Sequence, residues 1–154
     1  MTDIRPAELP HDLDRVRSLF REYAESLGID LEFQHFQSEL ETLPGRYQPP
    51  QGQILLAWRG RAAVGCVALR PLEGSSCEMK RLYVRPDARG EQLGRQLAER
   101  VCQAARAAGY SRICLDTLPS MGHALELYKR LGFKPIERYT YNPVQDAMFL
   151  ALDL

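Results

Sequence analysis

The segment LYVRPDARGEQLGRQ, residues 82–96, constrains the fold most, because it reads as a buried strand, a short turn and the start of a helix. Apolar, aromatic and β-branched residues from Leu82 to Val84 favour a strand, and Pro86 ends it. An apolar repeat at helical spacing begins at Leu93. Because the first turn of a helix leaves backbone N–H groups unpaired, this junction predicts a place where a diphosphate can bind.

Glycines and arginines at the junction support this prediction. Gly90 and Gly94 allow the backbone to approach a ligand closely, and Arg89 and Arg95 add positive charge at the rim. The chain contains neither the P-loop pattern G-x-x-x-x-G-K-[ST] nor the Rossmann pattern G-x-G-x-x-G. Taken alone, an ordinary strand-to-helix connection with a glycine turn explains the segment equally well.

Composition limits the class of protein. With 154 residues, of which 45% are hydrophobic and 26% charged, the chain fits one globular domain over residues 1–154. Its 20 basic and 20 acidic residues cancel, so neither a nucleic acid nor an anionic membrane is indicated as a partner. The amino terminus lacks a signal-peptide pattern, which favours a cytoplasmic protein. The 4 cysteines and 3 histidines lack ligand spacing, which predicts buried free thiols and no metal site.

Hydrophobic periodicity predicts a mixed α/β fold in the order β-α-α-β-β-β-α-β-α-β-β. The expected strands cover residues 4–5, 54–58, 62–69, 77–84, 113–116, 133–138 and 147–152. The expected helices cover residues 13–27, 30–43, 93–109 and 124–131. Gly28 and Gly132 are expected to end the first and last helices, and Asp30 to cap the second.

Two segments together resemble the GNAT superfamily of acyl-CoA-dependent N-acyltransferases. Motif A of that family, [QR]-x-x-G-x-[GA], has as its counterpart here Arg89, Gly90, Glu91, Gln92, Leu93 and Gly94. Gln92 stands where the family usually has a second glycine; a negative φ there tolerates glutamine, whereas a positive φ costs about 1 kcal/mol. The run ALELYKRLGF, from Ala124 to Phe133, resembles motif B, whose tyrosine lies beside the thioester sulfur.

The resemblance covers essentially the whole chain and implies a central mixed sheet, flanked by helices and splayed between strands 4 and 5. It implies an N-acetyltransferase that uses acetyl-CoA and transfers acetyl directly to an amine in a ternary complex. The pantetheine arm would pair with the strand as an added strand does. Met121 stands where the family often has an asparagine, so Thr117 or Ser120 is expected to replace that contact. The implied cofactor-binding residues are Leu82, Tyr83, Val84, Arg89, Gly90, Glu91, Gln92, Leu93, Gly94, Arg95, Thr117 and Ser120.

Two residues are candidates for proton transfer, because the attacking ammonium must lose a proton and the leaving thiolate gains one. Glu78 is the candidate base: on a regular strand it shares a face with Leu82 and Val84. A salt-bridged structural glutamate is the alternative. Tyr128, the motif B tyrosine, is the candidate acid, because a phenol remains protonated at pH 7. A packing role is its alternative.

The acceptor remains the least determined part of the prediction. The resemblance places it between the first two helices and the loop before the last strand, which makes Tyr23, His35, Tyr139, Tyr141 and Asn142 candidates. An amine-bearing small molecule or a peptide would fit, and a homodimer is allowed. The alternative function is an acyl-CoA-binding sensor or regulatory module without turnover.

Overall fold

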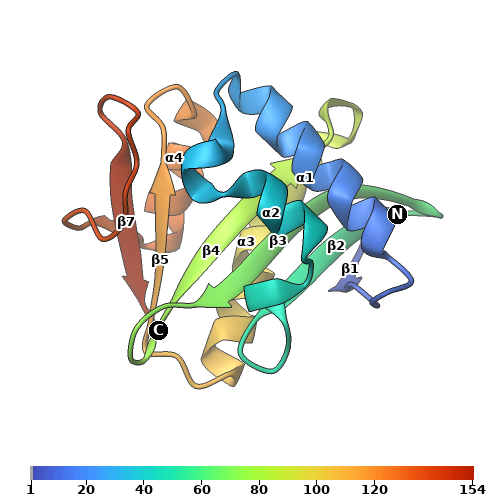
Figure 1. Ribbon diagram of the computed structural model, residues 1–154, viewed down its shortest axis with the longest axis horizontal. Coiled ribbons are helices and arrows are strands. Elements are labelled where there is room, and N and C mark those ends of the chain that lie inside the picture. Colours follow the sequence, from blue (N-terminus) through green and yellow to red (C-terminus); the bar gives the residue numbers. More distant parts are fainter. Residues whose placement is uncertain (1) are drawn as a thin grey trace.

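The computed structural model describes residues 2–154 and shows a twisted open sheet with helices on both faces (Figure 1). The 7 strands lie in the order β1-β2-β3-β4-β5-β7-β6. They are β1 (Thr2–Pro6), β2 (Gln53–Arg59), β3 (Ala62–Pro71), β4 (Ser76–Val84), β5 (Arg112–Thr117), β6 (Lys134–Pro135) and β7 (Met148–Asp153). All neighbouring pairs are antiparallel except β4 and β5, which are parallel.

Helices cover both faces of this sheet. The α-helices are α1 (Leu13–Leu27), α2 (Phe36–Glu41), α3 (Leu93–Ala107) and α4 (Gly122–Leu131). Short 3-10 helices are η1 (Leu31–Gln34), η2 (Gly45–Tyr47) and η3 (Pro86–Ala88). Figure 1 shows α1 and α2 in front of the sheet and α3 behind it. Within residues 2–154, no helix has the length and apolar character needed to cross a membrane.

Each layer of helices buries a separate apolar core. Leu93, Leu97 and Val101 of α3 pack with Tyr128 of α4 against one face of the sheet. Val16, Leu19 and Phe20 of α1 pack against the other face, where Leu56 and Cys66 lie. Two-sided burial explains why the central strands read as nearly continuous apolar runs. All four cysteines are buried free thiols, as predicted.

The sheet separates between β4 and β5, as the resemblance implied. These strands pair only through Ser76–Glu78 with Arg112–Cys114, near the start of each strand. The remainder of β4, up to Val84, and of β5, up to Thr117, have no pairing with each other. A gap lined by backbone groups and side chains therefore opens at the centre of the fold.

An extra residue in β4 changes the direction of its side chains. Cys66 of β3 pairs with Tyr83, while Ala68 pairs with Lys80, so three steps along β4 match two along β3. Arg81 lies in this bulge with a positive φ of 63°. Because side chains alternate along a strand, one additional residue moves every later side chain to the opposite face.

The predicted order of elements is confirmed, with two local differences. His35 adopts a left-handed φ of 57°, which divides the expected helix 30–43 into η1 and α2, although Asp30 does cap η1 through the amide of Glu32. The strand expected over 133–138 is paired only at Lys134 and Pro135. Beyond these two residues, the Ile136 amide still donates to the Phe149 carbonyl oxygen of β7 at 2.8 Å, so the contact with β7 continues for one more residue.

Candidate functional site

A groove follows the end of β4 and the start of α3, and we name it the β4–α3 groove. Its lining residues are Leu82, Tyr83, Val84, Arg89, Gly90, Gln92, Leu93, Gly94, His123, Ala124 and Leu127. Eight of the twelve expected cofactor-binding residues lie here together. The side chain of Arg89 donates from Nε to the carbonyl oxygen of Val84 at 3.1 Å, which fixes its position along the groove.

The start of α3 offers unpaired donors to this groove. The Gln96 amide is bonded to the Gln92 carbonyl at 3.0 Å, so the preceding amides of the first turn have no partner within the helix. Gln92 makes no capping hydrogen bond through its side chain. A Cβ at Gly90 or Gly94 would meet no described atom within 4 Å, so space for a ligand adjoins the donors. These features fit an anion such as a diphosphate.

The backbone of Gln92 could have a negative φ, which suits glutamine, or a positive φ, which is strained. Gln92 adopts the positive one. Its φ is 58°, in the left-handed region where glycine is favoured, and its side chain is exposed. Its side chain makes no capping hydrogen bond, and a left-handed φ at a residue other than glycine costs roughly 1–2 kcal/mol. The turn therefore keeps the backbone path that a glycine would take, with a polar side chain at its rim.

The other four expected cofactor residues lie outside the groove lining. Glu91 forms an ion pair with Arg59 at 3.0 Å, and Arg95 forms one with Glu99 at 2.7 Å. Ser120 lines neither the β4–α3 groove nor the cavity between β4 and β5. Thr117 does line the cavity between β4 and β5, where its hydroxyl donates to the sulfur of Met121 at 3.7 Å.

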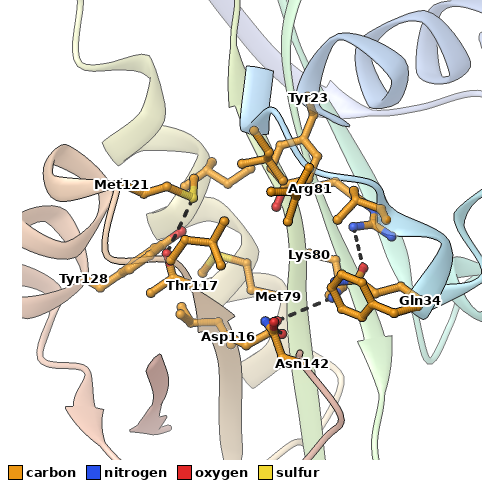
Figure 2. Close-up of a pocket in the computed structure, with 17 residues that line it drawn as sticks. Tyr23, Gln34, Met79, Lys80, Arg81, Asp116, Thr117, Met121, Tyr128 and Asn142 are labelled. Carbon is orange, nitrogen blue, oxygen red and sulfur yellow. Dashed lines mark hydrogen bonds and ion pairs between the residues drawn. The ribbon is translucent and has the colours of Figure 1, made fainter. Parts of the chain in front are cut away.

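A second cavity occupies the gap between β4 and β5, and we name it the splay cavity (Figure 2). Its apolar wall comes from α1 and the segment after it and includes Leu27, Ile29, Leu31 and Phe33. Its polar wall includes Lys80, Arg81, Asp116, Thr117 and Asn142. Leu82 lines both the splay cavity and the β4–α3 groove, so the two spaces adjoin each other.

Tyr128 reaches the splay cavity from α4. It is a buried residue whose ring packs against Phe133 with centroids 5.6 Å apart. Its hydroxyl has no hydrogen-bond partner in residues 2–154. The hydroxyl oxygen is not completely enclosed by protein atoms, so a bound molecule could reach it. Burial raises the pKa of Tyr128, so its hydroxyl stays protonated near neutral pH. The side chain is therefore an available proton donor at the cavity wall.

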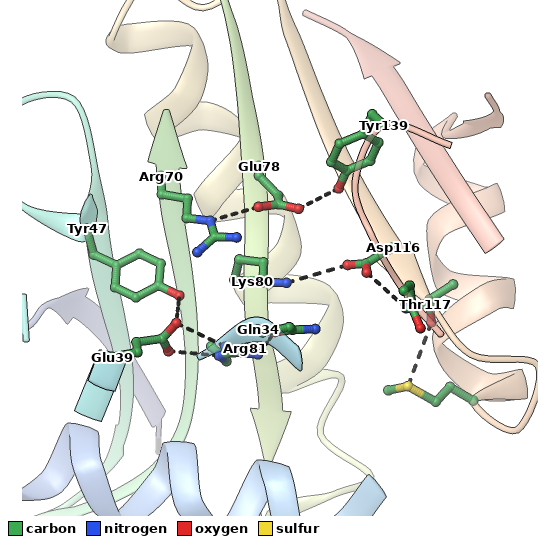
Figure 3. Close-up of polar contacts among 12 residues, drawn as sticks. Gln34, Glu39, Tyr47, Arg70, Glu78, Lys80, Arg81, Asp116, Thr117 and Tyr139 are labelled. Atoms are coloured by element: carbon green, nitrogen blue, oxygen red, sulfur yellow. Dashed lines mark hydrogen bonds and ion pairs between the residues drawn. The ribbon is translucent and has the colours of Figure 1, made fainter. Parts of the chain in front are cut away.

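An ion pair that the sequence analysis did not find crosses the gap. Lys80 Nζ of β4 lies 3.5 Å from Asp116 Oδ1 of β5, and Asn142 Nδ2 donates to Asp116 Oδ2 at 3.1 Å (Figures 2 and 3). All three residues line the splay cavity. The signal available in the sequence was a lysine inside a central strand and an aspartate at the end of another, since such buried charges need partners.

Glu78 does not face the groove, so its expected position on the strand was wrong. Cys77 and Met79 share the α3 core with Leu82 and Val84, which leaves Glu78 on the opposite face. The physical reason is the bulge at Arg81. Glu78 is buried, accepts from Arg70 Nε at 2.8 Å and from the Tyr139 hydroxyl at 2.6 Å, and does not line the splay cavity (Figure 3). Burial and the Glu78 charge raise the pKa of Tyr139, which keeps that donor protonated.

Replacing this carboxylate is expected to destabilise the fold. Glu78→Gln removes the charge that Arg70 and Tyr139 both contact, and hydrogen bonds to a charged group contribute about 1.5–3 kcal/mol each. We expect the free energy of unfolding, measured by urea denaturation, to fall by roughly that amount. Glu73→Gln, at an exposed position, is the control and should change little. A stable variant whose turnover recovers only at high pH would instead support Glu78 as the base.

The expected acceptor residues divide into two groups. Tyr23 and Asn142 line the splay cavity, whereas His35 forms the break between η1 and α2. Tyr139 is held by Glu78, and Tyr141 is 67% exposed with its ring edge-on to Phe33 at 6.1 Å. No cluster of three His, Cys, Asp or Glu side chains that could hold a metal is found among residues 2–154.

A helix start with unpaired backbone donors, beside a splayed pair of parallel strands, is the arrangement of an acyl-CoA-dependent acyltransferase. The profile of the Acetyltransferase (GNAT) family matches residues 13–133. An uncharacterized N-acetyltransferase of Schizosaccharomyces pombe is 42% identical over 153 residues, which is 98% of this chain and 94% of that protein. The chain belongs to the GNAT family and is an N-acetyltransferase that takes acetyl from acetyl-CoA.

Solved structures share this fold over nearly the whole chain. An acetyltransferase from Streptococcus agalactiae superposes with a TM-score of 0.83 at 26% identity and covers 99% of this chain and 98% of that one. YncA of Salmonella typhimurium, solved with its cofactor acetyl-CoA, superposes with a TM-score of 0.75 at 19% identity and covers 99% and 93%. The second likeness is one of fold alone.

Proposed function

We propose that the chain acetylates a small amine bound in the splay cavity while acetyl-CoA occupies the β4–α3 groove, so that transfer is direct within a ternary complex. The observation that carries this proposal is that Leu82 of β4 lines both spaces, so the two lie next to each other along the same strand. A cosubstrate whose diphosphate rests on the start of α3 would extend along β4 and bring its thioester to the cavity, beside Tyr128.

The transfer exchanges one bond for another. The lone pair of the amine attacks the thioester carbonyl carbon, the C–N bond forms and the C–S bond breaks. The acceptor ammonium loses two protons in all, and one proton is taken up by the departing thiolate, so one proton is released overall. Positioning both substrates contributes to the rate because a bimolecular encounter becomes an intramolecular step.

We assign the proton transfers to two side chains of the splay cavity. Tyr128 would donate to the thiolate, since its hydroxyl is protonated and has no other partner in the described chain. Asp116 would hold the ammonium and accept the proton that the nitrogen loses before attack, because its carboxylate lines the cavity while that of Glu78 does not. Glu78 would act at a distance, by holding Tyr139 of the loop that also supplies Asn142.

The shape of the splay cavity favours a small acceptor over a protein side chain. The residues that follow α1, including Ile29, Leu31 and Phe33, line part of the cavity. Asn142, from the loop before β7, lines another part and donates a hydrogen bond to Asp116. An acceptor enclosed by two segments of chain must fit between them. A compact amine with an apolar portion matches this lining.

Two experiments test the proposal: first a binding measurement and then a turnover assay. Acetyl-CoA at a hundredfold excess over its dissociation constant should stabilise the protein by about 2.7 kcal/mol, whereas ATP and NAD should not. A panel of small amines, read by release of free thiol from acetyl-CoA, should then identify the acceptor class. Stabilisation by ATP instead of acetyl-CoA would refute the use of the groove, and turnover only with protein lysines would refute the small acceptor.

We further propose that residues 1–154 form one acetyltransferase domain that works in the cytoplasm. The continuous sheet supports one domain, and four free cysteines fit a reducing compartment. The homodimer stays a prediction.

A further inference from the structure

The splay cavity contains two opposite charges that are almost fully buried. The side chains of Lys80 and Asp116 are only 5% and 6% exposed, and both line the cavity. Burying charge is costly unless each group gains hydrogen bonds or an opposite charge. The hydrogen bonds and ion pairs that each charged group already makes therefore show which group could still bind a ligand.

Neighbouring charges are already matched by partners in the protein. Arg81 donates to both oxygens of Glu39 at 3.0 Å and to Gln34 Oε1 at 2.8 Å (Figure 3). Glu78 is held by Arg70 and Tyr139. These two charges are therefore occupied, and neither requires a ligand.

Lys80 differs from Arg81 in this respect. Its ammonium carries three donors, yet within residues 2–154 its one charged contact is Asp116 Oδ1 at 3.5 Å, beyond the length of a strong hydrogen bond. Asp116 uses Oδ2 to accept from Asn142, which leaves Oδ1 facing Lys80. The cavity thus presents one under-satisfied cation and one available carboxylate oxygen, side by side.

We propose that the acceptor is a free α-amino acid, with its carboxylate bound by Lys80 and its ammonium by Asp116. One carbon atom separates the amino nitrogen from the carboxyl group in such a zwitterion, so the two ligand charges are as closely spaced as the two protein charges. This inference rests on the proposed function. It names Lys80 as the residue that selects acceptors carrying a carboxylate over simple amines and peptide ends.

The rest of the cavity indicates which amino acids fit. Leu27, Ile29, Leu31 and Phe33 form an apolar wall of the same cavity. An apolar side chain would lie against that wall, whereas a charged one would lose its hydration without gaining a partner. Acetylation removes the ammonium charge, so the product keeps its contact with Lys80 but loses that with Asp116, which assists its release.

The test compares acceptors that differ only in the carboxylate. Leucine, methionine and phenylalanine are assayed beside their amides, with kcat/KM taken from thiol release. The wild-type protein should prefer the best amino acid over its amide by at least about tenfold, because a site built for a polar group discriminates strongly against its absence. Lys80→Met should reduce that ratio to about one, and Lys80→Arg, which keeps a cation, should retain a preference.

Controls keep this inference separate from the proposed function. Lys134→Met, at an exposed position of β6, should leave the ratio unchanged, and each variant must still be stabilised by acetyl-CoA to show that it folds. Calorimetry with CoA and leucine provides a readout without turnover. Equal use of amino acids and amides, or a ratio unaffected by Lys80→Met, would overturn the inference while the acetyltransferase function stands. Failure of acetyl-CoA to bind the wild-type protein would overturn both.

Discussion

Gly94→Asp is expected to abolish binding of acetyl-CoA while the protein remains folded. Gly94 is the second residue of α3 and lines the β4–α3 groove, where an added carboxylate would face the diphosphate. A like charge placed across a binding site costs several kcal/mol, so affinity should fall at least about a hundredfold. Isothermal calorimetry with acetyl-CoA measures this loss.

The fold itself should tolerate this change. A Cβ at Gly94 meets nothing within 4 Å, and an acidic residue in the first turn of a helix interacts favourably with the helix dipole. Replacing a helical glycine also removes an entropic cost of about 0.5–1 kcal/mol. Gly94→Asn, which has the same shape without the charge, is the matched control and should bind more tightly than the aspartate. Unchanged affinity of Gly94→Asp would place the phosphates elsewhere.

The groove could be predicted from sequence because its determinants are local. A strand, a glycine turn and a helix start lie within residues 82–96, and their geometry follows from neighbouring residues alone. Helix α1 was predicted with its observed bounds for the same reason, since its apolar repeat and its terminal Gly28 are contiguous. The structure added the positive φ of Gln92, which a single sequence leaves open.

The splay cavity could not be predicted in this way, because its residues come from separate strands. The bulge at Arg81 decides on which face of the sheet the Glu78 side chain lies. That bulge is defined only by the register in which β4 pairs with β3. Lys80 and Asp116 meet because β4 and β5 begin as a parallel pair and then diverge. Assuming regular alternation through residues 78–84 puts Glu78 on the face of Leu82 and Val84, which the bulge reverses.

Charge within the central strand was nevertheless an available signal. The tetrapeptide from Glu78 to Arg81 carries three charges in a strand covered on both faces, and charged side chains are rarely buried without partners. Each of the three has its partner on a different element: Arg70 on β3, Asp116 on β5 and Glu39 on α2. Such a run in a central strand therefore indicates a polar network that surrounds a site.

Tyr128→Phe is expected to lower kcat by roughly tenfold or more and to leave the KM for acetyl-CoA nearly unchanged. The variant keeps the ring that packs on Phe133 and removes only the hydroxyl, which has no hydrogen-bond partner in the described chain to lose. Stability should therefore change little. Steady-state kinetics, with thermal denaturation beside them, measure both quantities.

The pH profile separates proton donation from a packing role. Because burial raises the pKa of Tyr128, the wild-type donor stays protonated through the neutral and mildly alkaline range, so the loss in kcat should be similar at each pH tested there. Tyr110→Phe is the matched control: its hydroxyl donates to the Gln51 carbonyl at 2.6 Å and lies in neither cavity lining. A fully active Tyr128→Phe would show that water protonates the thiolate. An unstable variant, or one that binds acetyl-CoA poorly, would show that Tyr128 acts mainly by packing.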